Sequence, residues 1–105
     1  MVKLFRRRYI AFKLNSAPTI SKRELLPMLI SNMEAVSKED SEQYHIRIIK
    51  YDAEIGLGVV RCDHRAVNLL LVVLRNPNKT LGNYDAKTIG ISGSIKTLRR
   101  KFLQD

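Results

Sequence analysis

The stretch YHIRIIKYDAEIGLGVVRC, residues 44–62, decides the fold because its pattern predicts two strands joined by a short turn. The first strand, residues 44–51, alternates between two faces. These faces carry Tyr44, Ile46 and Ile48 on one side and His45, Arg47, Ile49 and Tyr51 on the other. DAEIG turns the chain, and residues 57–62 return, with Gly56 and Gly58 where we expect a β-bulge. The stretch therefore predicts an antiparallel hairpin.

The segment that follows the hairpin predicts a helix over residues 64–75, with Asp63 as its N-cap. Residues 66–74 are apolar except Asn68, which is too wide a stripe for a helix that packs on one side only. Two interpretations stay open. In the first, the segment is a deeply buried core helix, or a strand, which the β-branched Val72 and Val73 would favour. In the second, it is a helix with a second apolar face that binds another protein.

Before the hairpin, residues 8–15 (RYIAFKLN) alternate and predict a strand with Ile10, Phe12 and Leu14 on one face. Ser21 and Glu24 then have the spacing of a capping box. Apolar residues follow at helical spacing: Leu26, Leu29, Ile30, Met33 and Val36. Pro27 is too deep for a helix capped at Ser21, so we expect the regular helix to begin near Leu26.

After the hairpin and its helix, residues 84–91 predict a fourth strand, and Ser94 caps a last helix that docks through Ile95, Leu98 and Phe102. The order βαββαβ plus a helix predicts an α+β, ferredoxin-like sandwich, with a four-stranded antiparallel sheet and both helices on one face. We expect one domain over residues 1–105, with a basic N-terminal arm (residues 1–8) and a C-terminal basic helix (residues 94–105).

The charge of the chain is segregated. The sequence has 19 basic and 10 acidic residues, a formal net charge of +9. Eight of these nine net charges lie in residues 1–13 and 94–105, whereas residues 34–42 are mainly acidic. If the fold brings the two ends together they form one basic face, and the expected partner is a polyanion such as nucleic acid.

Catalytic and metal chemistry are weakly supported. His45 and His64 are the only histidines, and neither has a nucleophile signature beside it, so we favour surface or capping roles over a histidine-dependent ribonuclease. Cys62 is the only cysteine, which excludes an intrachain disulfide and a thiolate zinc site. We expect no metal site, no signal peptide, no membrane span and a cytoplasmic location.

The glycines of GISGS, residues 90–94, do not make a P-loop, which needs a longer loop ending in Lys-Ser/Thr. A plain Ser94 cap is favoured over a phosphate held by the N–H groups of Gly93, Ser94 and Ile95. The third predicted strand has no aromatic residue, so recognition of the nucleic acid backbone by Arg and Lys is expected rather than base stacking.

Three segments in order carry a resemblance: RRRYIAFKL, KYDAEIGLGVVRCDHRAVNLLLVVL and GISGSIKTLRRKFL. Together they resemble the archaeal ribonuclease P protein component 2 family, essentially from end to end. The resemblance implies an RRM-like fold without base-stacking motifs. It implies a non-catalytic subunit of the enzyme that removes the 5′ leader from precursor tRNA, in which the RNA subunit holds the active site and requires Mg²⁺, while this chain binds no cofactor.

The partners implied by the resemblance are the ribonuclease P RNA, protein component 3, with which a heterotetramer is expected, and other ribonuclease P proteins; precursor tRNA is contacted indirectly. The expected RNA-binding residues are Lys3, Arg6, Arg7, Arg8, Lys13, Ser94, Lys96, Arg99, Arg100 and Lys101. The expected protein interface is Val67, Leu70, Leu71 and Leu74. The alternatives are a stand-alone or ribosome-associated RNA-binding module and a histidine-dependent ribonuclease.

Overall fold

The computed structural model describes residues 6–16, 19–37, 44–76 and 82–102. The strands are β1 (Arg7–Ser16), β2 (Arg47–Asp52), β3 (Leu57–Asp63) and β4 (Tyr84–Ser92). The helices are α1 (Lys22–Ser37), α2 (Val67–Arg75) and α3 (Ile95–Phe102), and a short 3-10 turn, η2 (His64–Ala66), precedes α2. The predicted α+β class and the order of the elements are confirmed.

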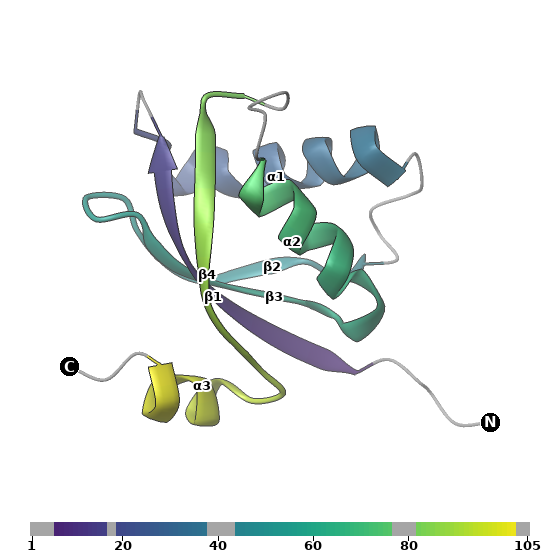
Figure 1. Ribbon diagram of the computed structural model, residues 1–105, viewed down its shortest axis with the longest axis vertical. Helices are drawn as coiled ribbons and strands as arrows, with labels where there is room; N and C mark the ends of the chain where they lie inside the picture. The colour runs from purple at the N-terminus through teal and green to yellow at the C-terminus, as the bar shows by residue number, and fades with distance from the viewer. Residues whose placement is uncertain (1–5, 17–18, 38–43, 77–81, 103–105) are drawn as a thin grey trace.

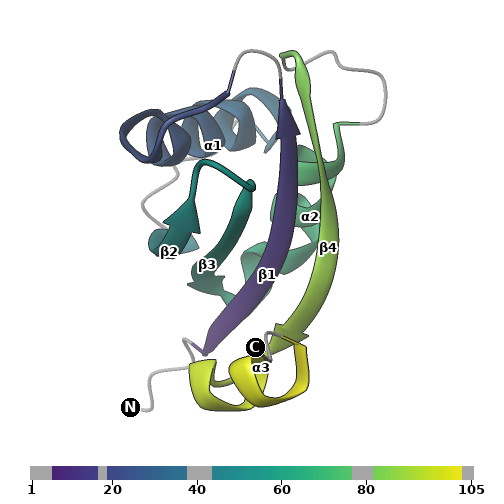
Figure 2. The same cartoon turned by 90° about the vertical axis from the view of Figure 1, so that its left-hand side faces the viewer.

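The four strands form one antiparallel sheet in the order β2-β3-β1-β4. Each of the two β-α-β units therefore encloses a strand of the other, which is the split arrangement of the ferredoxin-like sandwich. Helices α1 and α2 cover one face of the sheet, and α3 lies against the opposite side near the end of β4 (Figures 1 and 2). We call the side of the sheet on which α3 packs the α3 face.

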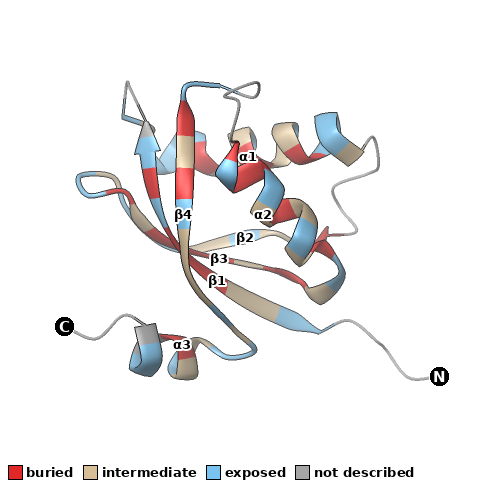
Figure 3. Ribbon diagram, in the orientation of Figure 1, coloured by how far each residue is buried: buried red, intermediate tan, exposed pale blue. Residues whose placement is uncertain are grey.

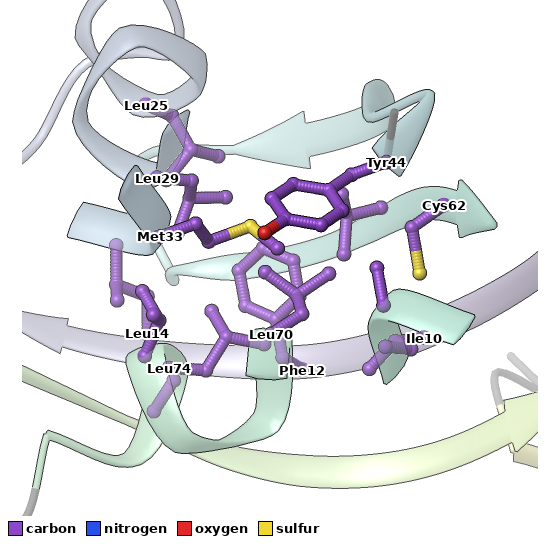
Figure 4. Close-up of a cluster of buried hydrophobic side chains, with 14 of the residues drawn as sticks. Ile10, Phe12, Leu14, Leu25, Leu29, Met33, Tyr44, Cys62, Leu70 and Leu74 are labelled. Carbon is purple, nitrogen blue, oxygen red and sulfur yellow. The ribbon is translucent and has the colours of Figure 1, made fainter. Parts of the chain in front are cut away.

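The main core lies between the sheet and the α1–α2 layer, as the buried segments in Figure 3 indicate. Figure 4 shows side chains from both helices meeting those of β1 and β3. The alternation of β1 predicted this, because every second residue faces the helices. The buried members of this core include Ile10, Phe12, Leu14, Leu25, Leu29, Met33, Tyr44, Val60, Cys62, Leu70, Val73 and Leu74.

The N-terminus of α1 is a capping box, as predicted. The Ser21 hydroxyl accepts a hydrogen bond from the Glu24 backbone N–H at 3.3 Å, and the Glu24 carboxylate accepts one from the Ser21 backbone N–H at 3.1 Å. The carboxylate also accepts a bond from the Ser21 hydroxyl at 3.0 Å, and the two bonds that it accepts hold the pKa of Glu24 below its ordinary value. They fix the first turn of the helix.

The expectation that α1 begins near Leu26 is wrong, because the helix begins at Lys22 and contains Pro27. Proline has no backbone N–H, so Pro27 cannot donate the helical hydrogen bond to the Arg23 carbonyl. Both residues are exposed, so water can take the place of that donor. The buried stripe is correspondingly Leu25, Leu29 and Met33, whereas Val36 is 43% exposed.

The hairpin forms as predicted, but its irregularity lies on β2. The register between β2 and β3 shifts between Ile48 and Lys50, not at the two glycines. The extra residue reverses the alternation, so Tyr51 packs on the main core instead of facing away from it, and its hydroxyl donates to the Ile20 carbonyl at 2.7 Å. The predicted face of Tyr51 is therefore wrong.

The apolar segment after the hairpin is the helix α2 and not a strand. Asp63 caps the preceding turn, its carboxylate accepting a hydrogen bond from the Arg65 backbone N–H at 3.1 Å. Leu70 and Leu74 are completely buried in the main core, so the expectation that they contact a partner is wrong. Val67 and Leu71 are half-buried and Val72 is 52% exposed, so α2 does have apolar surface beyond the core.

Candidate nucleic-acid interface

Helix α3 docks on the sheet through one apolar stripe. Leu98 is completely buried and forms a small second core with Ala11 of β1 and Val59 of β3, and the half-buried Ile95 packs against this cluster. Because Leu98 faces the sheet, positions two residues before and after it point away from the sheet. The basic side chains Lys96, Arg100 and Lys101 are exposed, and Arg99 is placed on α3 by its backbone.

The basic start of β1 lies beside the end of β4, where the chain enters α3 (Figure 2). Tyr9 lies opposite Ser92 in the sheet. A side chain at Gly93 would lie 3.4 Å from the Arg8 guanidinium, so Arg8 reaches the turn before α3. The structure thus brings the start of β1, which carries Arg6, Arg7 and Arg8, to the end of the sheet where α3 begins, as the segregated charge predicted. Lys3 lies outside the described residues.

Ser94 has the structural role that the sequence favoured. Its hydroxyl accepts a hydrogen bond from the Thr97 backbone N–H at 3.2 Å, and its own N–H donates to the Ser92 hydroxyl at 3.3 Å. The predicted Ser94 cap is therefore confirmed, whereas the contact of Ser94 with RNA stays a prediction.

Lys13 does not join this basic cluster. It lies six residues after Arg7 on β1, about 20 Å away at the rise of a strand. Lys13 is opposite Lys87 of β4, and both line a groove of about 560 Å³ at the far end of the sheet. Glu54 and Asp85 also line this groove and balance the two lysines.

Sequence reasoning missed basic residues in the middle of the chain that share the α3 face. Arg61 is two residues from Val59 on β3 and opposite Tyr9, and both of these residues pack in the α3 cluster. The alternation of strand side chains therefore places Arg61 on the α3 face. The missed residues, placed by register, are Arg47, Lys50, Arg61 and Lys87. The signal was present at Arg47, which the alternation had already placed away from the main core.

The acidic and histidine side chains next to this face are engaged in structure. The Asp63 carboxylate accepts hydrogen bonds from the Arg65 guanidinium at 2.6 and 3.1 Å. Burial alone would raise the pKa of Asp63, but the bonds from Arg65 outweigh it and hold that pKa below its ordinary value. His64 Nδ1 lies 3.0 Å from Asp63 Oδ1. Asp63 is therefore a cap and an ion-pair partner, which accounts for its position beside His64 without catalysis.

Cys62 is not an activated nucleophile. It is completely buried on the helix side of β3. Burial, with a smaller contribution from Asp63, raises the pKa of its thiol to about 12. Across the described ranges, no group of three or more His, Cys, Asp or Glu side chains is placed to hold a metal ion. Within the same ranges, no helix has the length and apolarity needed to cross a membrane.

The fold and the cations that register places on the α3 face define a small α+β domain with basic residues on one sheet face, a class suited to polyanion binding. A sequence model of the Rpp14/Pop5 family matches residues 8–103. The chain therefore belongs to the Rpp14/Pop5 family, as the three sequence segments predicted.

Relatives in sequence agree with this assignment. The chain is 34% identical to ribonuclease P protein component 2 of Pyrococcus horikoshii, over 91% of this chain and 82% of the relative. It is 32% identical to the protein of the same name in Archaeoglobus fulgidus, over 94% of this chain and 90% of the relative. It also resembles a chain in the cryo-EM structure of yeast ribonuclease MRP, with a TM-score of 0.64 at 12% identity, covering 90% of this chain and 79% of that one. At that identity the likeness supports the fold alone.

Proposed function

We propose that this chain is a non-catalytic, RNA-binding protein subunit of ribonuclease P, which supports removal of the 5′ leader from precursor tRNA. The observation that carries the proposal is that the basic start of β1 and the basic helix α3 lie at the same end of the sheet, in a member of this family. Cations gathered on one surface bind a phosphate backbone through charge and counterion release. RNA contacts are assigned to Arg6, Arg7, Arg8, Lys96, Arg99, Arg100 and Lys101.

Bond cleavage, in this proposal, belongs to the RNA subunit and its Mg²⁺, and the isolated chain is inactive. The commitment of Asp63 to Arg65 supports this, because an ionised carboxylate in an ion pair is not a free general base. The neutral Cys62 thiol supports it too, since the thiolate is the nucleophile.

The opposite side of the molecule is assigned to protein contact. Val67, Leu71 and Val72 give α2 an apolar surface outside the core, and component 3 of the same enzyme is the proposed partner. With the RNA on the α3 face and the protein on the helices, both can bind at once. The assembly is proposed to act in the cytoplasm.

Reconstitution tests the proposal. The chain is added, with and without component 3, to the ribonuclease P RNA transcribed from the same genome, at limiting Mg²⁺, and precursor tRNA cleavage is measured. We expect cleavage to rise only when the RNA is present. Cleavage by the chain alone, abolished by His64→Ala, would replace the proposal with a histidine-dependent ribonuclease.

The salt dependence of RNA binding tests the interface. If six charges meet phosphates, the slope of log K against log salt is about −4 to −5. Replacing Arg99, Arg100 and Lys101 with alanine should flatten this slope by about two to three units and leave the fold intact. An unchanged slope would remove α3 from the RNA interface.

A further inference from the structure

A row of polar and aromatic side chains crosses the whole sheet on the α3 face. Arg47 of β2 lies opposite Arg61 of β3, which lies opposite Tyr9 of β1, which lies opposite Ser92 of β4. Arg47 is exposed, whereas Arg61 and Tyr9 are half-buried. Neighbouring strands are about 4.8 Å apart, so the two arginines start from adjacent points on one surface.

The two arginines are an unfavourable pair in the free protein. Like charges directly opposite each other in an antiparallel sheet destabilise it. The ion pair found among the described residues joins Asp63 to Arg65, His64 Nδ1 lies 3.0 Å from the same carboxylate, and neither contact involves Arg47 or Arg61. Asp63, the carboxylate nearest to Arg61 along β3, is thus already occupied. Folding therefore holds two positive groups together without a counter-charge from the described part of the chain.

Arg61 carries a second cost. Its Nε is buried and has no hydrogen-bond partner within the described ranges. Buried donors in native proteins are nearly always paired, so such an exception needs a cause, for example an absent ion. An anion held between the two guanidinium groups would neutralise the repulsion, and a movement of the Arg61 side chain that uncovers Nε would let the same anion pair with it.

We propose that Arg47 and Arg61 together bind a phosphodiester group of the RNA, as a contact separate from those of α3 and the N-terminal arm. This inference rests on the proposed function. The planar fork of a guanidinium donates two parallel hydrogen bonds to phosphate oxygens, and one anion held between two forks gains charge-assisted bonds from both.

The surroundings favour RNA over an acidic protein segment. Arg7 lies on the same face of β1 two residues from Tyr9, and Lys50 lies on the same face of β2. Helix α3 packs against Tyr9 and carries exposed cations beyond it. Cations thus continue from the arginine pair both along the strands and across them, which matches a polyanion with a charge at every unit of its backbone.

The test compares two doubly substituted chains with the wild-type chain. Arg47→Gln with Arg61→Gln removes the pair, and Arg23→Gln with Arg75→Gln removes the same charge from exposed positions on the two helices of the other side. Binding to the ribonuclease P RNA transcript from the same genome is measured by fluorescence anisotropy across a range of salt. Because the pair holds one phosphate, we expect the slope of log K against log salt to flatten by about 0.7 to 0.9 for the first variant, and to change little for the control.

Stability gives the matching readout. Removing the repulsion and the unpaired donor should leave the urea midpoint of the free Arg47→Gln, Arg61→Gln chain unchanged or raised, although RNA binding falls. Arg61→Lys keeps the charge but loses Nε and the fork, and it should weaken binding about tenfold, the value of one charge-assisted hydrogen bond.

Three outcomes would overturn the inference. The first is a salt slope equal to that of the Arg23, Arg75 control. The second is a fall in stability that parallels the fall in binding, which would make the arginines structural. The third is binding of polyglutamate as tight as that of RNA and equally dependent on the pair, which would assign it to an acidic protein. If the salt slope flattens for the Arg99, Arg100, Lys101→Ala variant and not for the Arg47→Gln, Arg61→Gln variant, only this inference fails. If the wild-type chain does not bind the RNA, the proposed function fails.

Discussion

Replacing Leu98 with alanine would test whether the position of the α3 charges matters as well as their number. Leu98 is completely buried between α3 and the sheet and is the central contact of the second core. An eight-residue helix is too short to persist in water by itself. Losing this contact should therefore release α3 from the sheet while the net charge of the chain stays at +9.

The expected cost follows from the burial. Truncating a fully buried leucine to alanine removes about three carbon groups at about 0.8 kcal/mol each, and the remaining cavity adds to this. The second core is small, so part of the cavity can close as α3 shifts. We expect the Leu98→Ala chain to lose about 2–3 kcal/mol of unfolding free energy.

Urea unfolding followed by circular dichroism measures the loss, with Val72→Ala as control. Val72 is 52% exposed on α2, so its truncation should cost less than about 0.5 kcal/mol. RNA affinity should fall for Leu98→Ala and not for Val72→Ala. A Leu98→Ala chain with wild-type stability would show that α3 is not held by this contact. If the chain loses the expected unfolding free energy but keeps wild-type RNA affinity, the placement of the α3 charges does not matter for binding.

Two further changes test the framework of the sheet. Gly56 has a φ of +77°, and a Cβ there would meet the Leu14 carbonyl oxygen. Gly56→Ala should therefore lower the unfolding free energy by about 2–4 kcal/mol, measured by thermal unfolding. Gly93→Ala is the control: its Cβ would meet only the end of the Arg8 side chain, and the loss should be below about 1 kcal/mol. The Cys62 thiol has a pKa of about 12 in the folded chain and of 9.0 in the unfolded chain. The stability that comes from the neutral thiol is therefore complete below pH 9.0 and declines as the pH rises from 9.0 to about 12. The slope of stability against pH in that range, compared between wild-type and Cys62→Ala chains, measures this effect, and equal slopes would contradict the buried thiol.

Local signals in the sequence predicted most of the fold. The alternation of β1 placed Ile10, Phe12 and Leu14 in the core, and the capping box at Ser21 and the serine cap at Ser94 marked two helix starts. These features depend on a few neighbouring residues, so one segment carries the whole signal.

The errors arose where contacts between distant parts of the chain determine which face a residue occupies. The reversal at Tyr51 depends on the register between β2 and β3, and a single extra residue changes it without any mark in the local pattern. The apolar width of α2 could not show which side meets the core, and packing selected Leu70 and Leu74. The middle of the chain has nearly equal numbers of basic and acidic residues, so its charge gives no sign of a basic surface. The strand register, which the sequence pattern does not give, places Arg47 and Arg61 on one face.

Strand β1 is paired on both sides, with β3 and with β4, and β4 follows β3 along the chain. During synthesis on the ribosome, β1 must therefore wait until β4 has been made before its second edge is closed. Contacts of such long separation slow folding. Because α3 follows β4 along the chain, the surface proposed to bind RNA is completed only after β1, β2 and β3 have been made.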